Sequence, residues 1–167
     1  MRYLPETSII RSVPDQAGTG PPKEMSVRDG LVLNGGLVAK QLTDDQRRLL
    51  REPNLASLAT LDDDGRPHVT PVWVDEEDGR IVVNTADGRA KVRHLRREPR
   101  VGILVMDRED PYTWVSIRGR VVEITTDGAH DHIDELSRRY EGKAFDHPPG
   151  QVRLKVLIEP DQVTEYR

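Results

Sequence analysis

The most informative part of this sequence is residues 55–84, "LASLATLDDDGRPHVTPVWVDEEDGRIVVN". It contains three short runs of β-prone residues, separated by Asp64-Gly65 and Asp78-Gly79. An Asp-Gly pair between two such runs is a strong local signal for a tight hairpin. We therefore expect three antiparallel strands, at about residues 55–61, 67–74 and 80–84.

The flanking sequence predicts three helices. Thr43 and Gln46 have the spacing of a capping box, and Pro53 ends the helix that they begin. A second helix is expected over about residues 88–97, with Asp87 as its N-cap. The third is "HDHIDELSRRY", residues 130–140, which presents apolar side chains at helical spacing.

Three more strands are expected. "VGILVMD" is expected to be a buried strand, and "YTWVSIRGRVVEIT" a long alternating one in which Gly119 marks a bulge or a close backbone approach. In "QVRLKVLIEP", residues 151–160, we expect the apolar side chains to face inward and Arg153 and Lys155 to face outward. There are too few helices for parallel crossovers, so the fold class is mainly β: a six-stranded antiparallel barrel with peripheral helices.

The chain divides into an extension and one domain. Residues 1–40 are rich in Pro, Gly and charge without sustained periodicity, and they are expected to be poorly structured or to lie against a neighbour. Residues 41–167 are expected to form the barrel domain.

Composition excludes several classes of protein. The absence of cysteine rules out thiolate catalysis and cysteine-ligated metals, and it fits a cytoplasmic protein. No apolar run is long enough to span a membrane, and none resembles a secretory signal. A net charge of −4 argues against a nucleic-acid partner.

A cationic segment nevertheless follows the three strands. Six cations and one acid lie between residues 89 and 100, which raises three explanations: an anionic ligand, a nucleic-acid surface, or a solvated helix face. Arg89 and Lys91 fall in the first helical turn, where the helix dipole disfavours positive charge unless an anion is bound. They predict a phosphate site, and Gly88, which has no side chain, would let the ligand approach the backbone closely. For the cations further along, two explanations remain, an anionic ligand and an ordinary solvated face. These cations are Arg93, Arg96, Arg97 and Arg100.

Nucleic acid is the weakest of the three explanations, because the segment has no interleaved aromatic residues for base stacking.

Three segments together resemble a known family: "REPNLASLATLDDDGRPHVTPVWV", "IVVNTADGRAKVRHLRREPRVGILVMD" and "YTWVSIRGRVVEIT". They are similar to the pyridoxamine 5'-phosphate oxidase-like flavin and deazaflavin proteins, and within these to the coenzyme F420-dependent oxidoreductases. The resemblance covers about residues 42–167. It implies an FMN-binding-like split β-barrel and a homodimer with its cofactor sites at the interface.

The resemblance also implies site residues. "GRAKVRHL" resembles the phosphate-binding segment of the family, and "HVTPVWV" resembles the strand that lies along the cofactor ring. Asn84 and Thr85 resemble the strand end that supports the cofactor, while Tyr112 and Trp114 would come from the partner subunit. The implied cofactor-binding set is His68, Pro71, Val72, Trp73, Asn84, Thr85, Arg89, Ala90, Lys91, Tyr112 and Trp114.

The resemblance leaves two cofactors open, F420 and FMN. The chain ends soon after its last expected strand, whereas the classical oxidases continue, and the outer-face arginines would suit the polyanionic tail of F420. We therefore expect a reductase that transfers hydride between reduced F420 and a small organic substrate. The alternatives are an FMN-binding enzyme and a binding protein without turnover.

No catalytic acid or base is assigned by the sequence. His68 and Tyr112 are candidates for supplying a proton, although a structural role is the commoner one for such residues. Trp73 is either cofactor wall or core. "HDHID" could bind a divalent metal, but a polar helix start explains it better, and no metal site is expected.

Overall fold

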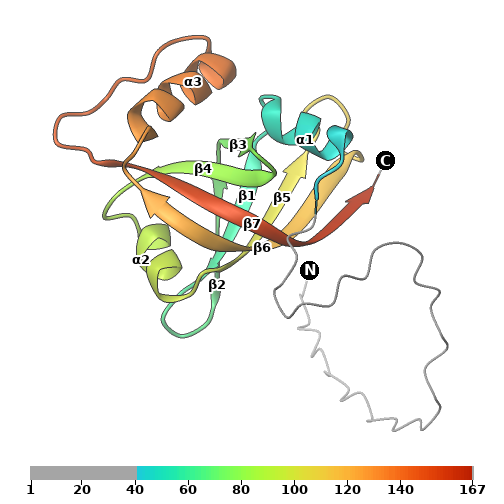
Figure 1. The fold of residues 1–167 in the computed structure, drawn as a ribbon, viewed down its shortest axis with the longest axis horizontal. Coiled ribbons are helices and arrows are strands. Elements are labelled where there is room, and N and C mark those ends of the chain that lie inside the picture. Colours follow the sequence, from blue (N-terminus) through green and yellow to red (C-terminus); the bar gives the residue numbers. More distant parts are fainter. Residues whose placement is uncertain (1–40, 167) are drawn as a thin grey trace, which may run out of the picture. The chain divides into compact units, whose positions relative to one another are not determined.

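The computed structural model describes residues 41–166, which form one curled antiparallel sheet with three helices (Figure 1). The expected extension, residues 1–40, lies outside the described residues. The strands are β1 (Ala56–Leu61), β2 (Pro67–Val72), β3 (Val74–Glu77), β4 (Arg80–Ala86), β5 (Arg100–Met106), β6 (Trp114–Thr125) and β7 (Arg153–Tyr166). The helices are α1 (Asp44–Arg51), α2 (Ala90–Arg97) and α3 (Ala129–Glu141). The mainly-β antiparallel barrel is therefore confirmed, with seven strands in place of six.

The seventh strand arises because the run expected at residues 67–74 divides at Trp73. Val72 pairs with Ala56 of β1, whereas Val74 pairs with Val83 of β4. In the sheet order β2-β1-β5-β6-β7-β4-β3, the two edge strands are thus consecutive in the chain. The sheet curls until its edges meet at Trp73, which joins them covalently rather than by a ladder of hydrogen bonds.

Both predicted hairpins are present. Asp78 and Gly79 have φ angles of 50° and 82°, the left-handed conformations that a two-residue turn between twisted strands requires. In the first hairpin the carboxylate of Asp62 accepts hydrogen bonds from the amides of Asp64 and Arg66, at 3.0 and 2.8 Å. These local contacts fix the register of β1 with β2 and of β3 with β4.

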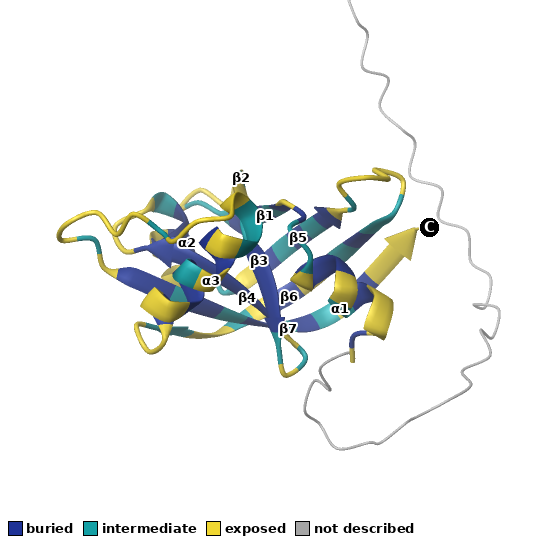
Figure 2. Ribbon diagram, turned by 90° about the horizontal axis from the view of Figure 1, so that it is seen from above, coloured by how far each residue is buried: buried dark blue, intermediate teal, exposed yellow. Residues whose placement is uncertain are grey.

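The core consists mainly of strand residues, and Figure 2 shows the buried residues gathered on the strands and the exposed ones mostly on loops and helices. Alternate residues of β1 and β5, such as Leu58 and Ile103, are almost completely buried. The predicted capping box begins α1, with Thr43 and Gln46 each bonded to the other's backbone, and Leu50 of this helix is fully buried. No helix among residues 41–166 is long and apolar enough to cross a membrane.

Gly119 occupies the predicted bulge in β6, where the register with β7 shifts. A Cβ atom at this position would lie 2.5 Å from the carbonyl oxygen of Glu159. The close approach of the two backbones explains the glycine. It also lets the longest strands of the sheet, β6 and β7, bend together along the curl.

Candidate functional site

A cavity of about 330 Å³ opens beside the corner at Trp73. The β2–β3 junction, the end of β4, the starts of α2 and β7, and α3 all contribute to it. Its lining residues are Leu55, Pro71, Val72, Trp73, Asn84, Arg89, Lys91, Ile133, Phe145 and Arg153. Six residues of the set implied by the resemblance are brought together here: Pro71, Val72, Trp73, Asn84, Arg89 and Lys91.

Lys91 is the most unusual cation of this cavity. Its side chain is only 7% exposed, and no acidic side chain within residues 41–166 pairs with it. Burial, reinforced by the nearby charge of Arg89, lowers its pKa. A buried ammonium without a counter-ion is costly, and an anion in the cavity would compensate it.

Helix α2 begins two residues later than expected, and the prediction of Asp87 as its N-cap is wrong. Gly88 has a φ of 79°, and the turn it makes leaves Arg89 as an N-cap with no capping side chain. The carboxylate of Asp87 instead pairs with Arg96 at 3.1 Å. The amides of Ala90 and Lys91 precede the first intrahelical hydrogen bonds, so they remain available to a ligand.

Arg153 was expected to face outward, and this expectation is wrong. The side chain is 4% exposed, whereas Val152 before it is 50% exposed. Its Nε and Nη2 atoms donate to Oδ1 of Asn84 at 2.9 and 2.6 Å, and Nη1 donates to Oε1 of Gln151 at 2.9 Å. Burial and the charge of Arg89 lower its pKa to about 10, so it remains charged at neutral pH.

Nothing in the alternating pattern of β7 distinguishes Arg153 from Lys155, which forms an ordinary ion pair with Glu77 at 2.7 Å. The burial of Arg153 arises from residues far away in the sequence: Asn84 on β4, and Phe145, whose ring centroid lies 4.9 Å from the guanidinium carbon. Leu55, Ile133 and Phe145 were missed in the same way, because only the folded chain places them at the cavity.

Trp73 has two roles at once. It lines the cavity, and one face of its ring stacks on Tyr140 of α3, with centroids 5.3 Å apart and planes at 19°. The hydroxyl of Tyr140 in turn donates to the carbonyl of Asn54 at 2.7 Å. The core and cofactor-wall interpretations are therefore compatible, because Tyr140 holds the indole that faces the cavity.

The remaining residues of the implied set do not line this cavity. Ala90 is half-buried in α2, Thr85 is 1% exposed on β4, and the ring of His68 meets His94 edge-on at 5.2 Å. Tyr112 is 78% exposed, and Trp114 stacks on Tyr166 with centroids 6.2 Å apart. The last two were expected to serve the partner's site rather than their own.

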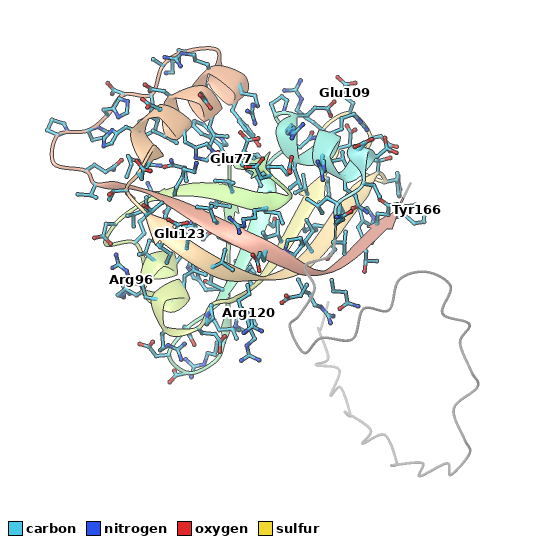
Figure 3. All side chains as sticks on the ribbon, viewed as in Figure 1. Glu77, Arg96, Glu109, Arg120, Glu123 and Tyr166 are labelled. Atoms are coloured by element: carbon cyan, nitrogen blue, oxygen red, sulfur yellow. The ribbon has the colours of Figure 1, made fainter. Side chains whose placement is uncertain are left out.

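The remaining arginines of α2, and Arg100 at the start of β5, are mostly engaged with the protein's own acids. Arg96 on the outer side of α2 (Figure 3) pairs with Asp87, and Arg97 pairs with Asp63 at 3.0 Å. Arg100 pairs with Glu98 at 2.8 Å, which lowers the pKa of that carboxyl to about 2. Among the four, only Arg93 has no acidic partner within residues 41–166, so an ordinary solvated face accounts for the other three.

Comparison with known proteins gives one family. The pyridoxamine 5'-phosphate oxidase model, whose family binds flavin or deazaflavin cofactors and includes oxidoreductases, matches residues 42–166. A solved F420 reductase is 26% identical, with a TM-score of 0.66 over 74% of this chain and 98% of that one.

Two further solved structures are similar. A conserved hypothetical protein from Mycobacterium tuberculosis is also 26% identical, with a TM-score of 0.58 over 76% of this chain and 89% of that one. HupZ from Group A Streptococcus, at 18% identity and a TM-score of 0.55 over 74% of this chain and 98% of that one, shares the fold. With the family model spanning almost all of the described residues, the chain belongs to the pyridoxamine 5'-phosphate oxidase family.

Proposed function

We propose that the protein is an F420-dependent oxidoreductase and that the cavity beside Trp73 holds the cofactor. The observation that carries the proposal is Lys91, a buried cation at the cavity with no acid to pair with it within residues 41–166. With Arg89 and the free amides at the start of α2, it suits a phosphate group. The similarity to a solved F420 reductase favours this cofactor over FMN.

In this proposal the cofactor supplies hydride transfer, and the protein supplies position and electrostatics. Lys91 and Arg89 hold the phosphate, while Pro71, Val72 and Trp73 form the wall against the ring. The stacking of Trp73 on Tyr140 fixes that wall before the ligand arrives. The titratable groups that line the cavity are all cations, so its own lining provides binding charge rather than a general acid or base.

FMN remains the alternative cofactor, because it offers the same phosphate and a similar ring. The ion pairs of Arg96, Arg97 and Arg100 remove much of the reason to assign these arginines to the acidic tail of F420. The preference for F420 therefore depends on the structural similarity and on the charge inside the cavity.

We also propose that two copies of the chain associate through the outer face of β2, β1, β5 and β6, here called the outer sheet face. Small side chains form its centre: Ser57, Ala59, Gly102 and Ser116. Exposed apolar side chains border them: Leu55, Val69 and Met106. Small and apolar side chains gathered on one sheet face in this way are typical of an interface between subunits.

The outer sheet face adjoins the cavity. Leu55 and Pro71 belong to both, because they alternate with the buried residues of β1 and β2. Trp114 lies on the same face, since it pairs with Met106. A second copy on this face would border the cavity and could present Trp114 and the neighbouring Tyr112 to it.

Titration of the purified protein with F420 and with FMN, followed by fluorescence, tests the proposal. We expect F420 to bind more tightly than FMN and reduced F420 to be oxidised when a panel of small electron acceptors is added. Tight binding of FMN alone would favour the FMN enzyme. Tight binding of F420 without turnover against any acceptor would favour a binding protein.

A further inference from the structure

Arg153 is a buried charge whose hydrogen-bond partners are both neutral. Its guanidinium donates to the side-chain oxygens of Asn84 and Gln151, and no carboxylate pairs with it within residues 41–166. We propose that Arg153 binds an anionic oxygen of the cavity's ligand, from a phosphate or a carboxylate, together with Arg89 and Lys91. This inference assumes that the cavity is the ligand site of the proposed function.

The charges of the cavity support a ligand with more than one negative charge. Arg89, Lys91 and Arg153 all line it, and the charge of Arg89 is felt by both of the others. Buried charges are normally paired, and repulsion from the exposed Arg89 adds to the cost of burying Lys91 and Arg153. An oxyanion between them would offset both costs.

The guanidinium retains donors for such a ligand. An arginine has five N–H groups, and three hydrogen bonds from Arg153 are present, which leaves two N–H groups without an acceptor in the part of the chain that the structure describes. Since the side chain lines the cavity, an oxyanion there is the natural acceptor. Hydrogen bonds between charged partners are about twice as strong as neutral ones.

A polar network holds Arg153 in this position. Asn84 donates through Nδ2 to the carbonyl of Ala129 at 2.7 Å and meets Nδ1 of His132 at 3.3 Å. Both contacts are acceptors when Nδ1 of His132 is unprotonated, so the amide oxygen of Asn84 must point to Arg153. His132 then adds no further positive charge next to the cavity. The network places the arginine without neutralising it.

The competing explanation is a purely structural arginine that ties the start of β7 to β4 and to Phe145. The two explanations differ in what neutralising the charge does. A structural arginine would leave anion binding unchanged when replaced. If Arg153 binds an anion, replacing it would weaken the binding of anionic ligands. The ligand-free protein would then lose less stability than if the arginine were purely structural, or would become more stable.

The test compares Arg153→Gln and Arg153→Lys with Arg80→Gln, a control that removes the same charge from an exposed ion pair with Glu159. Each variant is titrated with F420, FMN and riboflavin, which lacks phosphate. We expect Arg153→Gln to weaken F420 binding by about tenfold or more, Arg153→Lys to weaken it less, and Arg80→Gln to match the wild type. Riboflavin binding should change little in all of them.

The two anionic ligands separate the sources of the oxygen. Equal losses for FMN and F420 would assign Arg153 to the phosphate, and a loss confined to F420 would assign it to a tail carboxylate. Unchanged binding of both in Arg153→Gln, or a riboflavin loss as large as the F420 loss, would overturn the proposal.

Thermal unfolding of the ligand-free protein with inorganic phosphate gives a second readout. We expect phosphate to raise the wild-type melting temperature more than chloride does at equal ionic strength, and Arg153→Gln to lose much of that increase. The same increase in Arg153→Gln as in the wild type would contradict the proposal. If the wild type binds neither F420 nor FMN yet responds to phosphate through Arg153, the proposed function fails and the anion site stands.

Discussion

The Nη2 atom of Arg153 lies 2.6 Å from Oδ1 of Asn84, so a buried guanidinium has an amide where a carboxylate is usual. Elsewhere in the described chain a buried acid has a cationic partner: Asp75 pairs with Arg139 at 2.8 Å. The buried negative charge of Asp75 is therefore compensated, whereas the buried positive charge at the cavity is not. That imbalance is the physical basis for proposing a polyanionic ligand.

Replacing Lys91 with Met should weaken F420 binding by about ten- to a hundredfold, because a charge-assisted contact to phosphate is worth ~1.5–3 kcal/mol. The ligand-free variant should be at least as stable as the wild type, since the change removes a buried cation close to Arg89. Fluorescence titration and urea unfolding measure the two effects.

Arg93→Met is the matched control, because this exposed arginine of the same helix also has no acidic partner within residues 41–166. It should weaken F420 binding less, and its effect should decrease as salt is added. Equal losses in the two variants would argue against Lys91 as the phosphate ligand. The phosphate assignment would also fail if replacing Lys91 weakened the binding of F420 and of a tail-less deazaflavin without phosphate by the same factor.

Stability should fall as the pH is lowered through the range in which His132 resists protonation. Burial lowers the pKa of this 3%-exposed histidine to about 4. The negative charges of Glu77 and Asp75 raise the pKa, and the positive charges of Lys155 and Arg139 lower it further. The unfolded chain takes up this proton near pH 6.5, whereas the folded chain does so only near pH 4. The contribution of His132 to the free energy of unfolding is therefore fully present above pH 6.5 and is lost as the pH falls toward 4.

Between about pH 7.5 and about pH 5 the loss from this group should be about 2 kcal/mol. Urea unfolding at several pH values measures it, and His132→Gln should show a shallower dependence of the unfolding free energy on pH. His130→Gln, a change at an exposed histidine of the same helix, serves as the control. A slope that is identical in His132→Gln and the wild type would show that His132 titrates normally.

Gly119→Ala should destabilise the fold by about 1–3 kcal/mol, because the new Cβ would lie 2.5 Å from a backbone oxygen of β7. The midpoint of urea unfolding measures the change. Gly102→Ala is the comparison, since its Cβ would lie 3.6 Å from that of Ala59, an ordinary contact. If both variants unfold at the same urea concentration, the close approach at the bulge is not what requires glycine.

Ala59→Arg should convert the proposed dimer to a monomer, because it places a large charge at the centre of the outer sheet face, where Ala59 lies opposite Val69 and Gly102. Light scattering coupled to size exclusion gives the mass. Val122→Arg alters an apolar residue that is 44% exposed in the second half of β6, and it should leave the dimer intact. A wild-type protein that is monomeric at micromolar concentration and still binds F420 fully would contradict the proposal.

Elements set by contacts within a few residues were predictable from the sequence. The capping box of Thr43 and Gln46 and the Asp78-Gly79 turn each depend on neighbours in the chain, and both are present as expected. The bulge at Gly119 was also predicted, because a glycine inside an alternating strand indicates a close backbone approach. The antiparallel fold class followed from these hairpins and from the small number of helices.

The hairpins, the helices and the cationic start of α2 thus follow from the sequence, since short-range geometry and charge fix them. Two features arise only from tertiary contacts: the strand through Trp73 divides between two partners, and Arg153 faces inward. Both outcomes depend on pairing and packing with residues distant in the chain: β1 and β4 for the corner, and Asn84 and Phe145 for the arginine. The alternation of side chains along a strand assigns successive residues to opposite faces. Which face is buried at each end of the strand depends on the elements that pack against it in the folded chain.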